Sequence, residues 1–465
     1  MKIINKVFCA LLFFVFPQQF LISQTNDFRL PNYEKFVLQN GLTIYLMEQH
    51  EVPLIYVSAI FPAGAVKDGD KNGLAALTAE ALLFGTSNYT KEEIEETFDF
   101  YGAELNTSGL PEYSGLSSYF LKNDQDKLLP IIKDVIVNPI FPNDEFEKRK
   151  QRWLVELDQD KESPRSVIRS YFNKFIFGSN PYGNPVSGSK ETVGKLIVND
   201  LKSYHNNYYK PSGSALAVVG DFSSSEMKVK LTELFGNWEN RRTLSLTDIP
   251  SDDLVHNKSR VLLVNKDDSN ETTFYIGQLG ITRSNPDYIE IRVLNTILGG
   301  RFTSWLNEEL RINTGLTYGA GSVFIPYRTS GTFLISSFTK TSTTTEAIDL
   351  ALEVLKRLHT KGVDEETLNS AKNYIKGQFP TGYETSGELA SLLTAMFFYN
   401  ISDAYINEFQ KRVDDLTVEK ANDIVEKYFP EDNLQFVLIG KASELKDKIL
   451  KYGEVTEKEI LNDGF

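Results

Sequence analysis

The sequence predicts an α+β protein built from two similar halves in tandem. Segments rich in β-branched and aromatic residues alternate with segments of helical periodicity along most of the 465 residues. The two halves also end in the same order: a capped helix, a tyrosine, a proline, an apolar strand and a glycine. A polar stretch, 240–258, lies between them and is the expected linker. We therefore expect two α+β units, each a mainly antiparallel sheet covered by helices.

The elements expected in the first half, 33–239, follow from local residue patterns. Thr90-Lys91-Glu92-Glu93 has the pattern of a capping box and predicts the start of a helix. An amphipathic helix is expected from Asn72 to near Gly85. The expected strands are Lys35–Leu38, Thr43–Met47, Leu54–Phe61, Ala103–Thr107, Ser114–Leu121 and Ser214–Val219, with helical stretches from Gln125 to about Phe177 and a helix from Asn199.

The second half, 259–452, repeats the closing elements of the first. Leu416-Thr417 is expected to cap a helix that ends near Tyr428, and the strand Leu434–Ile439 then leads to Gly440. Chance similarity of two strand–helix endings is the alternative to a duplication. The last residues, 453–465, are expected to form a tail.

The first residues, 1–24, have the pattern of a secretory signal peptide. Two lysines precede an apolar run, Val7–Phe16, and cleavage is expected near Ser23 or Gln24. The run is shorter than the roughly 20 residues that span a bilayer, so an uncleaved anchor is the less favoured alternative. The sequence thus predicts an exported protein, with a bacterial periplasm as the expected location.

Composition argues against several classes of function. The single cysteine, Cys9, lies in the expected signal, so the mature chain should have neither disulfides nor thiol chemistry. The formal charge of −14 becomes −16 once the two signal lysines are removed, and no basic stretch follows. Such an acidic chain argues against nucleic acid and anionic membrane surfaces as partners. Stable membrane insertion is not expected after cleavage.

The most informative stretch is Asn72–Thr86, which reads Asn-Gly-Leu-Ala-Ala-Leu-Thr-Ala-Glu-Ala-Leu-Leu-Phe-Gly-Thr. It resembles the active-site helix of the M16 peptidases, the family of pitrilysin, insulinase and mitochondrial processing peptidase. In that helix two histidines four residues apart bind zinc, and the glutamate before the second histidine activates water. The histidine positions here are Ala76 and Glu80, and the base position is Ala79. The zinc motif is therefore degenerate.

The resemblance extends from about Tyr33 to Leu450. Leu38-Gln39-Asn40-Gly41-Leu42 before a strand and Phe61-Pro62-Ala63-Gly64-Ala65 before the helix fit the family in order and spacing. The resemblance implies two tandem homologous M16-type halves. The N-terminal half would carry the degenerate zinc motif, and the C-terminal half an arginine–tyrosine pair.

The third zinc ligand of the family corresponds to Glu156, which the solvated face of an acidic helix explains at least as well. Glu80 and Glu156 without an imidazole make a poor zinc site, and no base remains at Ala79. The histidines are scattered, without an i, i+4 pair: His50, His205, His256 and His359. We expect no metal or other cofactor on this chain, and zinc on a partner subunit.

A second informative block, Leu298–Ser322, resembles the M16 segment that carries the arginine–tyrosine pair. The matching residues are Arg311 and Tyr318, and the resemblance implies that they support catalysis in trans, at the zinc site of a partner. Arg311 is expected to end a helix before a turn at Gly315, and Tyr318 to begin the next strand. A guanidinium can bind substrate carbonyls and a phenol can donate to an oxyanion. The alternative is an ordinary helix-end arginine and an ordinary strand tyrosine.

The same resemblance makes the strand after the second helix a free sheet edge that binds extended peptide. The expected substrate-binding residues are Ala103, Glu104, Leu105 and Asn106. Backbone pairing needs no particular side chain, so this edge can bind peptide without cleaving it. The alternative is a plain edge strand protected by the charge of Glu104.

These features predict a non-catalytic M16 subunit that pairs with a zinc-bearing M16 partner to degrade or process unfolded peptides. The alternative is a peptide-binding or scaffolding protein with no role in cleavage. An active metallopeptidase with an altered site is the least favoured interpretation.

Overall fold

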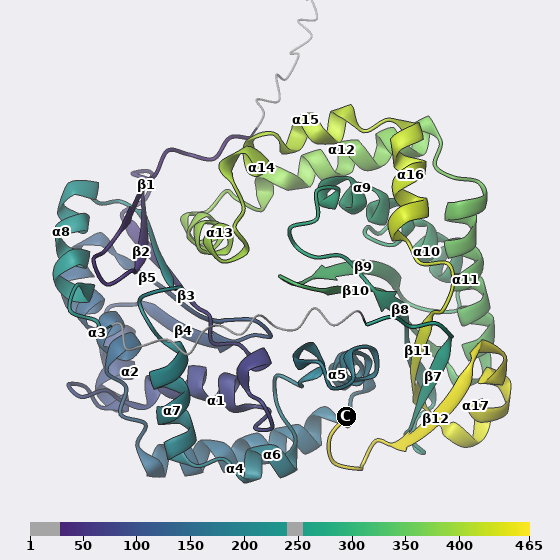
Figure 1. Ribbon diagram of the computed structural model, residues 1–465, viewed down its shortest axis with the longest axis horizontal. Coiled ribbons are helices and arrows are strands. Elements are labelled where there is room, and N and C mark those ends of the chain that lie inside the picture. Colours follow the sequence, from purple (N-terminus) through teal and green to yellow (C-terminus); the bar gives the residue numbers. More distant parts are fainter. Residues whose placement is uncertain (1–27, 240–253) are drawn as a thin grey trace, which may run out of the picture.

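The computed structural model describes residues 28–239 and 254–465, which form two sheets with helices around and between them (Figure 1). The α+β class and the two-part organisation predicted from the sequence are confirmed. The expected signal peptide, 1–24, and residues 240–253 of the expected linker lie outside the described residues. In the described ranges, no helix combines the length and apolar character that a membrane crossing requires.

Each sheet has six strands, in the order β1-β2-β6-β3-β5-β4 in the first half and β12-β7-β11-β8-β10-β9 in the second. The strands of the first sheet are β1 (Glu34–Val37), β2 (Thr43–Glu48), β3 (Leu54–Phe61), β4 (Glu104–Gly109), β5 (Ser114–Leu121) and β6 (Ala215–Gly220). Those of the second are β7 (Arg260–Asn265), β8 (Glu271–Leu279), β9 (Ala320–Pro326), β10 (Gly331–Lys340), β11 (Gln435–Gly440) and β12 (Glu454–Glu459).

The helices of the first half are α1 (Leu74–Ala81), α2 (Lys91–Phe100), α3 (Gln125–Val137), α4 (Asn143–Asp160), α5 (Pro164–Phe177), α6 (Lys190–Gly194), α7 (Val198–Tyr208) and α8 (Ser224–Phe235). Those of the second are α9 (Tyr288–Leu298), α10 (Trp305–Asn307), α11 (Thr344–Thr360), α12 (Glu365–Thr381), α13 (Ser386–Tyr399), α14 (Asp403–Asn407), α15 (Phe409–Asp415), α16 (Val418–Tyr428) and α17 (Ala442–Ile449).

The two sheets match strand for strand except at one edge. In both, a strand from near the end of the half inserts into the sheet beside an early strand and runs parallel to it, as β6 does to β2 and β11 to β7. The next three strands pair antiparallel in the same order. The outer strand differs, because β1 pairs antiparallel with β2 whereas β12 pairs parallel with β7. The expected tail, 453–465, thus contains a sheet strand.

Local start signals in the sequence act as expected. The Thr90 hydroxyl accepts a hydrogen bond from the backbone N–H of Glu93, whose carboxylate accepts one from the N–H of Thr90, so the predicted capping box is present. Thr417 caps α16. The predicted strand near Ala103 begins one residue later and extends to Gly109.

An exchange of helices joins the two halves. α5 of the first half packs against β8 and β11 of the second sheet, and α13 of the second half packs against β3 and β6 of the first. Figure 1 shows both helices in the space between the two sheets. The apolar core around each sheet is therefore completed by the opposite half.

Strand β6 shows the consequence of this exchange, because it is buried at every position. Leu216 and Val218 belong to the core of the first half. The alternating residues Ala217 and Val219 belong instead to the core that includes α13. Burial on both faces explains why this strand reads as a continuous apolar run rather than an alternating one.

On the opposite sheet, Phe172 of α5 is fully buried against the strands of the second half. Its ring lies 5.7 Å from that of Tyr275, edge to face. A Cβ on Gly277 of β8 would lie 2.7 Å from the Phe172 ring, so glycine at this position permits the close approach of α5.

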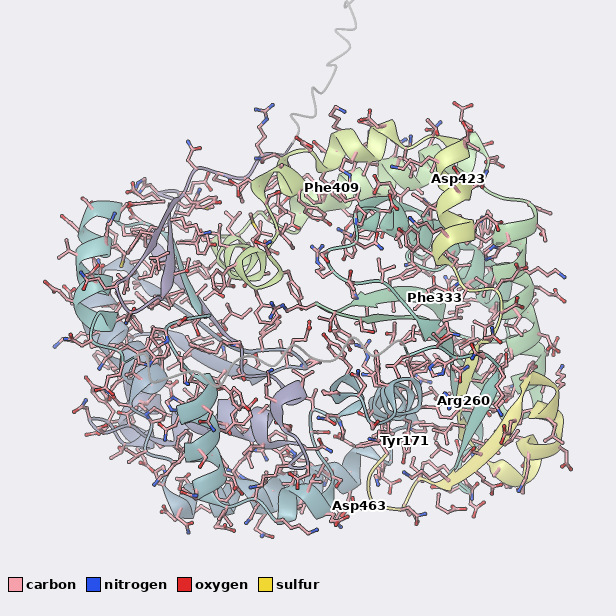
Figure 2. All side chains as sticks on the ribbon, in the orientation of Figure 1. Tyr171, Arg260, Phe333, Phe409, Asp423 and Asp463 are labelled. Carbon is pink, nitrogen blue, oxygen red and sulfur yellow. The ribbon has the colours of Figure 1, made fainter. Side chains whose placement is uncertain are left out.

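Residues near both ends of the described part of the chain also reach the opposite half. The backbone N–H of Leu30 donates to the Asn407 side chain at 2.8 Å. Asp463 lies near the C-terminal end of the chain (Figure 2). Its carboxylate accepts from the backbone N–H groups of Lys190 and Glu191, at 2.9 and 2.7 Å, at the start of α6. The termini therefore reinforce the joining of the halves by α5 and α13.

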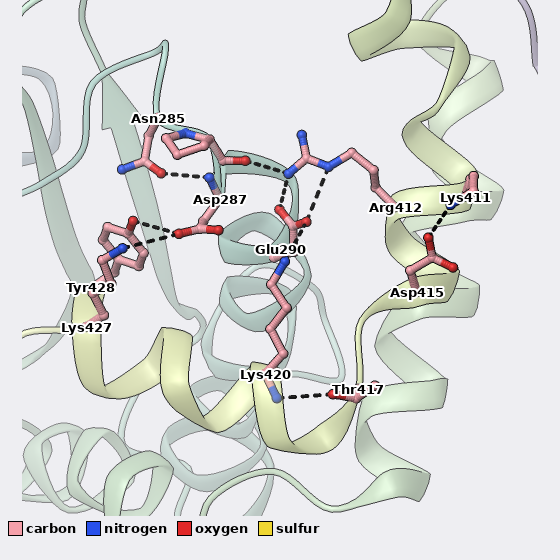
Figure 3. Close-up of polar contacts among 11 residues, drawn as sticks. Asn285, Asp287, Glu290, Lys411, Arg412, Asp415, Thr417, Lys420, Lys427 and Tyr428 are labelled. Carbon is pink, nitrogen blue, oxygen red and sulfur yellow. Dashed lines mark hydrogen bonds and ion pairs between the residues drawn. The ribbon is translucent and has the colours of Figure 1, made fainter.

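Within the second half, a buried carboxylate fixes α9 to the helices around it (Figure 3). Glu290 of α9 is 3% exposed and pairs with Arg412 of α15 at 2.5 Å and with Lys420 of α16 at 3.5 Å. The Tyr428 hydroxyl donates to Asp287 at 2.8 Å. Two cations and their hydrogen bonds offset the cost of burying the Glu290 charge.

A second buried carboxylate, Glu112, lies where the halves meet. It accepts hydrogen bonds from the Tyr182 hydroxyl at 2.7 Å, the Arg328 backbone N–H at 2.9 Å and the Tyr399 hydroxyl at 3.1 Å. Arg328 and Tyr399 belong to the second half. Burial raises the pKa of Glu112, although the hydrogen bond from Tyr182 acts in the opposite direction.

Substituting Phe172 tests the helix exchange. Phe172→Ala is expected to lower the free energy of unfolding by about 3–5 kcal/mol, because it leaves a cavity between α5 and the second sheet. Urea unfolding followed by circular dichroism measures the change. Phe100→Ala, at a phenylalanine that is 81% exposed, is the matched control and should change stability by no more than about 0.5 kcal/mol. Equal effects of the two variants would contradict the role given to α5.

The free energy of unfolding should depend on pH through Glu112, which lies where the two halves meet. Because its pKa is higher in the folded than in the unfolded protein, the unfolded state binds fewer protons between the two pKa values. The free energy of unfolding of the wild type, minus that of Glu112→Gln, should therefore fall as pH rises from the ordinary value of 4.5 through the raised pKa. Each unit between the two pKa values contributes about 1.4 kcal/mol. Urea titrations across this range would contradict the assignment if the difference stayed constant.

Candidate functional site

Helix α1, which carries the degenerate motif, is held at its N-terminus by Asp68. The Asp68 carboxylate accepts from the backbone N–H groups of Gly73 at 2.9 Å and Ala75 at 2.8 Å. Gly73 has φ of 97°, a left-handed conformation that favours glycine. The helix therefore begins at Leu74, after this turn, rather than at Asn72 as predicted. Burial raises the pKa of Asp68 well above its ordinary value, against the effect of the backbone hydrogen bonds.

The predicted amphipathic character of α1 is wrong. All of its residues except Glu80 are buried, because α7 packs against it as well as strands β4 and β5 of its own sheet. A Cβ on Gly109 of β4 would lie 2.4 Å from the Ala76 Cα, so the strand and the helix are in direct backbone contact. Ala79, at the base position, is fully buried and does not line the cavity described below.

The two carboxylates at metal-ligand positions meet at an arginine. Arg149 of α4 donates from Nε to Glu80 at 2.5 Å and from its two terminal nitrogens to Glu156 at 3.1 and 2.9 Å. Its side chain is 13% exposed, and its guanidinium lies 4.6 Å from the centre of the Trp153 ring. A guanidinium thus lies between the two acids that the resemblance places around zinc.

These residues do not fit a zinc ion. Position 76 offers no ligand atom, and both oxygens of Glu156 are bound to the Arg149 guanidinium. Zinc sites need three protein ligands at least, and a fixed cation repels a second cation. Within residues 28–239 and 254–465, no group of three or more His, Cys, Asp or Glu side chains has the arrangement of a metal site.

Arg149 is the residue that sequence reasoning missed. Arg149, Trp153 and Glu156 are spaced i, i+4 and i+7 and so share one face of α4. That spacing was visible in the sequence. The partner on α1, Glu80, lies 69 residues away along the chain, and only the fold brings it to the same guanidinium.

Strand β4 lies at the edge of its sheet, where the resemblance implies a peptide-binding edge. Among the described residues it pairs with β5 alone. Glu104, Leu105 and Asn106 lie within the strand. Ala103 does not; it is buried, and its N–H donates to the Phe98 carbonyl at 2.9 Å in the turn before β4.

A cavity of about 530 Å³ lies at the C-terminal end of β4. Thr107, Ser108 and Gly109 line it on the strand side, and Ala76 and Glu80 line it on the side of α1. Further walls come from Trp153 of α4, from α5, from residues 181–187 and from Tyr327 of the second half. The degenerate motif and the free edge therefore border one cavity, at which both halves contribute residues.

Arg311 and Tyr318 do not line this cavity. Arg311 lies in the last turn of a π-helical segment, η5 (Glu308–Asn313), close to the helix end predicted for it, and its guanidinium is 4.7 Å from the Phe302 ring. Tyr318 is 82% exposed and precedes β9 by two residues, so it does not begin that strand as predicted. Within the described part of the chain, neither side chain forms a hydrogen bond or an ion pair. Both are accessible to a second molecule.

Comparison with known families gives two matches. Residues 44–190 match the family model described as Insulinase (Peptidase family M16). Residues 195–375 match the model described as Peptidase M16 inactive domain. The two matches together cover most of both halves.

Relatives of similar length carry contrasting names. A Bacillus subtilis protein named "Uncharacterized zinc protease YmxG" is 23% identical over 406 residues, 86% of this chain and 96% of the relative. A Helicobacter pylori protein named "Non-peptidase homolog YmxG" is 24% identical over 419 residues, 88% of this chain and 94% of the relative.

Solved structures with M16 and protease titles have a similar fold. The crystal structure of a peptidase M16 inactive domain from Pseudomonas fluorescens superposes with a TM-score of 0.82 at 25% identity, covering 88% of this chain and 98% of that one. A protease structure from Helicobacter pylori superposes with a TM-score of 0.79 at 21% identity, covering 88% of this chain and all of that one.

Introducing the two histidines and the glutamate of the family motif should not by itself create a zinc site. In a triple variant, Ala76→His with Ala79→Glu and Glu80→His, Arg149 still holds Glu156 and repels the metal. We expect the additional change Arg149→Ala to increase zinc affinity by at least about tenfold. Competition with a fluorescent zinc chelator measures this affinity. Arg152→Ala, at an exposed arginine on the same helix, is the matched control. Equal zinc affinity with and without Arg149 would contradict this account.

Proposed function

Because the chain belongs to the M16 peptidase family, we propose that it is a non-catalytic subunit that pairs with a zinc-bearing M16 partner to process unfolded peptides. The partner would supply zinc, water and the general base. This chain would supply Arg311, Tyr318 and part of the wall that holds the peptide.

The observation that carries the proposal is the contrast between the metal-site positions and the peptide-binding edge. Ala76 and Ala79 offer neither ligand nor base, and Arg149 binds the carboxylates of both Glu80 and Glu156. The free edge of β4 and the cavity beside it are nevertheless retained. A chain with this combination can hold a peptide but lacks the groups that activate water for its cleavage.

The surface around Arg311 supports pairing with a second chain. Arg311 stacks on Phe302, which is 61% exposed, and Ile312 and Tyr318 are 59% and 82% exposed. Exposed aromatic and arginine side chains of this kind are enriched in protein interfaces. The location of the pair outside this chain's own cavity agrees with action on a partner's substrate.

The name of the Helicobacter pylori relative, a non-peptidase homolog, supports the absence of independent activity. The relatives named as zinc proteases show that the family also includes proteins described as enzymes. The two kinds of names are consistent with a family in which active and inactive chains coexist.

A peptide-binding or scaffolding protein without any role in cleavage is the second candidate. It is favoured by the stacking of Arg311 on Phe302, which gives the arginine a packing role within this chain. In that case Arg311 would contribute to an interface without touching substrate.

The test of the proposed function is peptidase activity in a complex with a zinc-bearing M16 protein from the same source. The complex should cleave a quenched unstructured peptide, and this chain alone should not. Arg311→Ala should lower kcat of the complex by about 100-fold, because a donor aimed at developing charge contributes chiefly to the transition state. Zinc content and complex mass should stay unchanged. Tyr318→Phe, which removes only a hydroxyl, should act in the same direction.

Matched controls are Arg152→Ala and Tyr374→Phe, at an exposed arginine and a tyrosine that is 41% exposed. Full activity of the Arg311→Ala complex would overturn the role of the arginine. Failure of the two chains to associate would overturn the pairing. Protection of β4 amides from hydrogen exchange by added peptide, without cleavage in any mixture, would establish the second candidate instead.

A further inference from the structure

Two charged side chains line the cavity beside β4, and only one of them has an ion-pair partner in the described part of the chain. The charged residues that line it are Glu80 and Arg169. Glu80 pairs with Arg149 at 2.5 Å, and the same guanidinium also pairs with Glu156. Arg169 forms neither an ion pair nor a hydrogen bond within the described ranges. Arg169 is therefore a cation of the lining that no carboxylate of the described residues pairs with.

Arg169 lies on the polar face of α5, and this face lines the cavity. Ser166, Arg169, Ser170 and Asn173 line the cavity, at the spacing of one helix face. The opposite face, which includes Phe172, is buried against the second sheet. The backbone that carries Arg169 is thus fixed by the same packing that joins the two halves.

The free edge of β4 leads into this cavity. Thr107, Ser108 and Gly109 line it from the strand. A peptide that pairs with β4 alternates its side chains between the two faces of the sheet, so every second residue beside this segment points toward the cavity. Trp153 and Tyr327 form apolar parts of the wall, and the Arg169 side chain is exposed, so a peptide in the cavity can reach it.

We propose that this cavity selects extended peptides that carry a carboxylate, and that Arg169 is the residue that recognises it. A guanidinium binds a carboxylate through two parallel hydrogen bonds, which gives geometric as well as electrostatic selectivity. The inference rests on the proposed peptide-binding function and specifies its ligand class. The carboxylate belongs either to an aspartate or glutamate side chain or to the free C-terminus of the peptide.

Three labelled decapeptides of otherwise identical neutral sequence distinguish these sources. The first has one central glutamate and an amidated C-terminus, the second has glutamine in its place, and the third has glutamine and a free C-terminal carboxylate. Fluorescence anisotropy measures their binding to the full chain, either alone or in its complex. We expect the glutamate peptide or the free-carboxylate peptide to bind at least about tenfold more tightly than the neutral amidated one.

Substitution of the arginine should remove this preference and leave the rest of the binding. Arg169→Gln should bind all three peptides with the affinity that the wild type shows for the neutral one. Arg169→Glu should reverse the preference toward a peptide with a central lysine. Arg165→Gln is the matched control, because Arg165 lies one turn earlier on α5, pairs with Glu271 and does not line the cavity.

The outcomes separate this inference from the function on which it rests. Equal affinity of the wild type for all three peptides, with β4 amides protected from hydrogen exchange, would overturn the role of Arg169 and leave peptide binding intact. A carboxylate preference that persists in Arg169→Gln would also overturn it. Absence of binding and of β4 protection with every peptide would overturn the peptide-binding function and the inference together.

Discussion

The exchange of α5 and α13 between the halves is the constraint on which the rest of the structure depends. Each sheet has a second apolar face that its own half does not cover, and the helix from the other half covers it. Separating the halves would expose both faces to water, at a large cost in hydrophobic free energy. The exchange also fixes the cavity, since the α5 face opposite the second sheet lines it.

At the positions that the resemblance assigns to a metal site, the fold holds a guanidinium between two acids. Glu80 and Glu156 would repel each other if no cation separated them, and the Arg149 guanidinium takes that place. An arginine cannot activate water as a zinc ion does, because it offers no open coordination position. The ion pairs of Arg149 therefore link α1 to α4 without the water-activating chemistry that a metal ion would supply.

Much of the fold follows from local sequence signals, and the failures occur where packing decides. The strands at Leu54–Phe61 and Ser114–Leu121 have the predicted bounds, because runs of apolar and β-branched residues between turns are local features. The predicted amphipathicity of α1 is wrong, because α7 packs against the helix in addition to the strands of its own sheet. Tyr318 was placed at a strand start, but the turn that precedes β9 is longer than the sequence indicated.

The sequence by itself determined the family, the duplication and the loss of the zinc motif. These depend on residue types and spacings along the chain, and alanine at 76 and 79 lacks ligand and base in any fold. Only the tertiary structure decided which charged side chains form ion pairs. Glu80 meets Arg149 across 69 residues, and Arg169 shares a cavity with β4 without a partner. Electrostatic pairing depends on distances between elements remote in sequence, which local patterns do not encode.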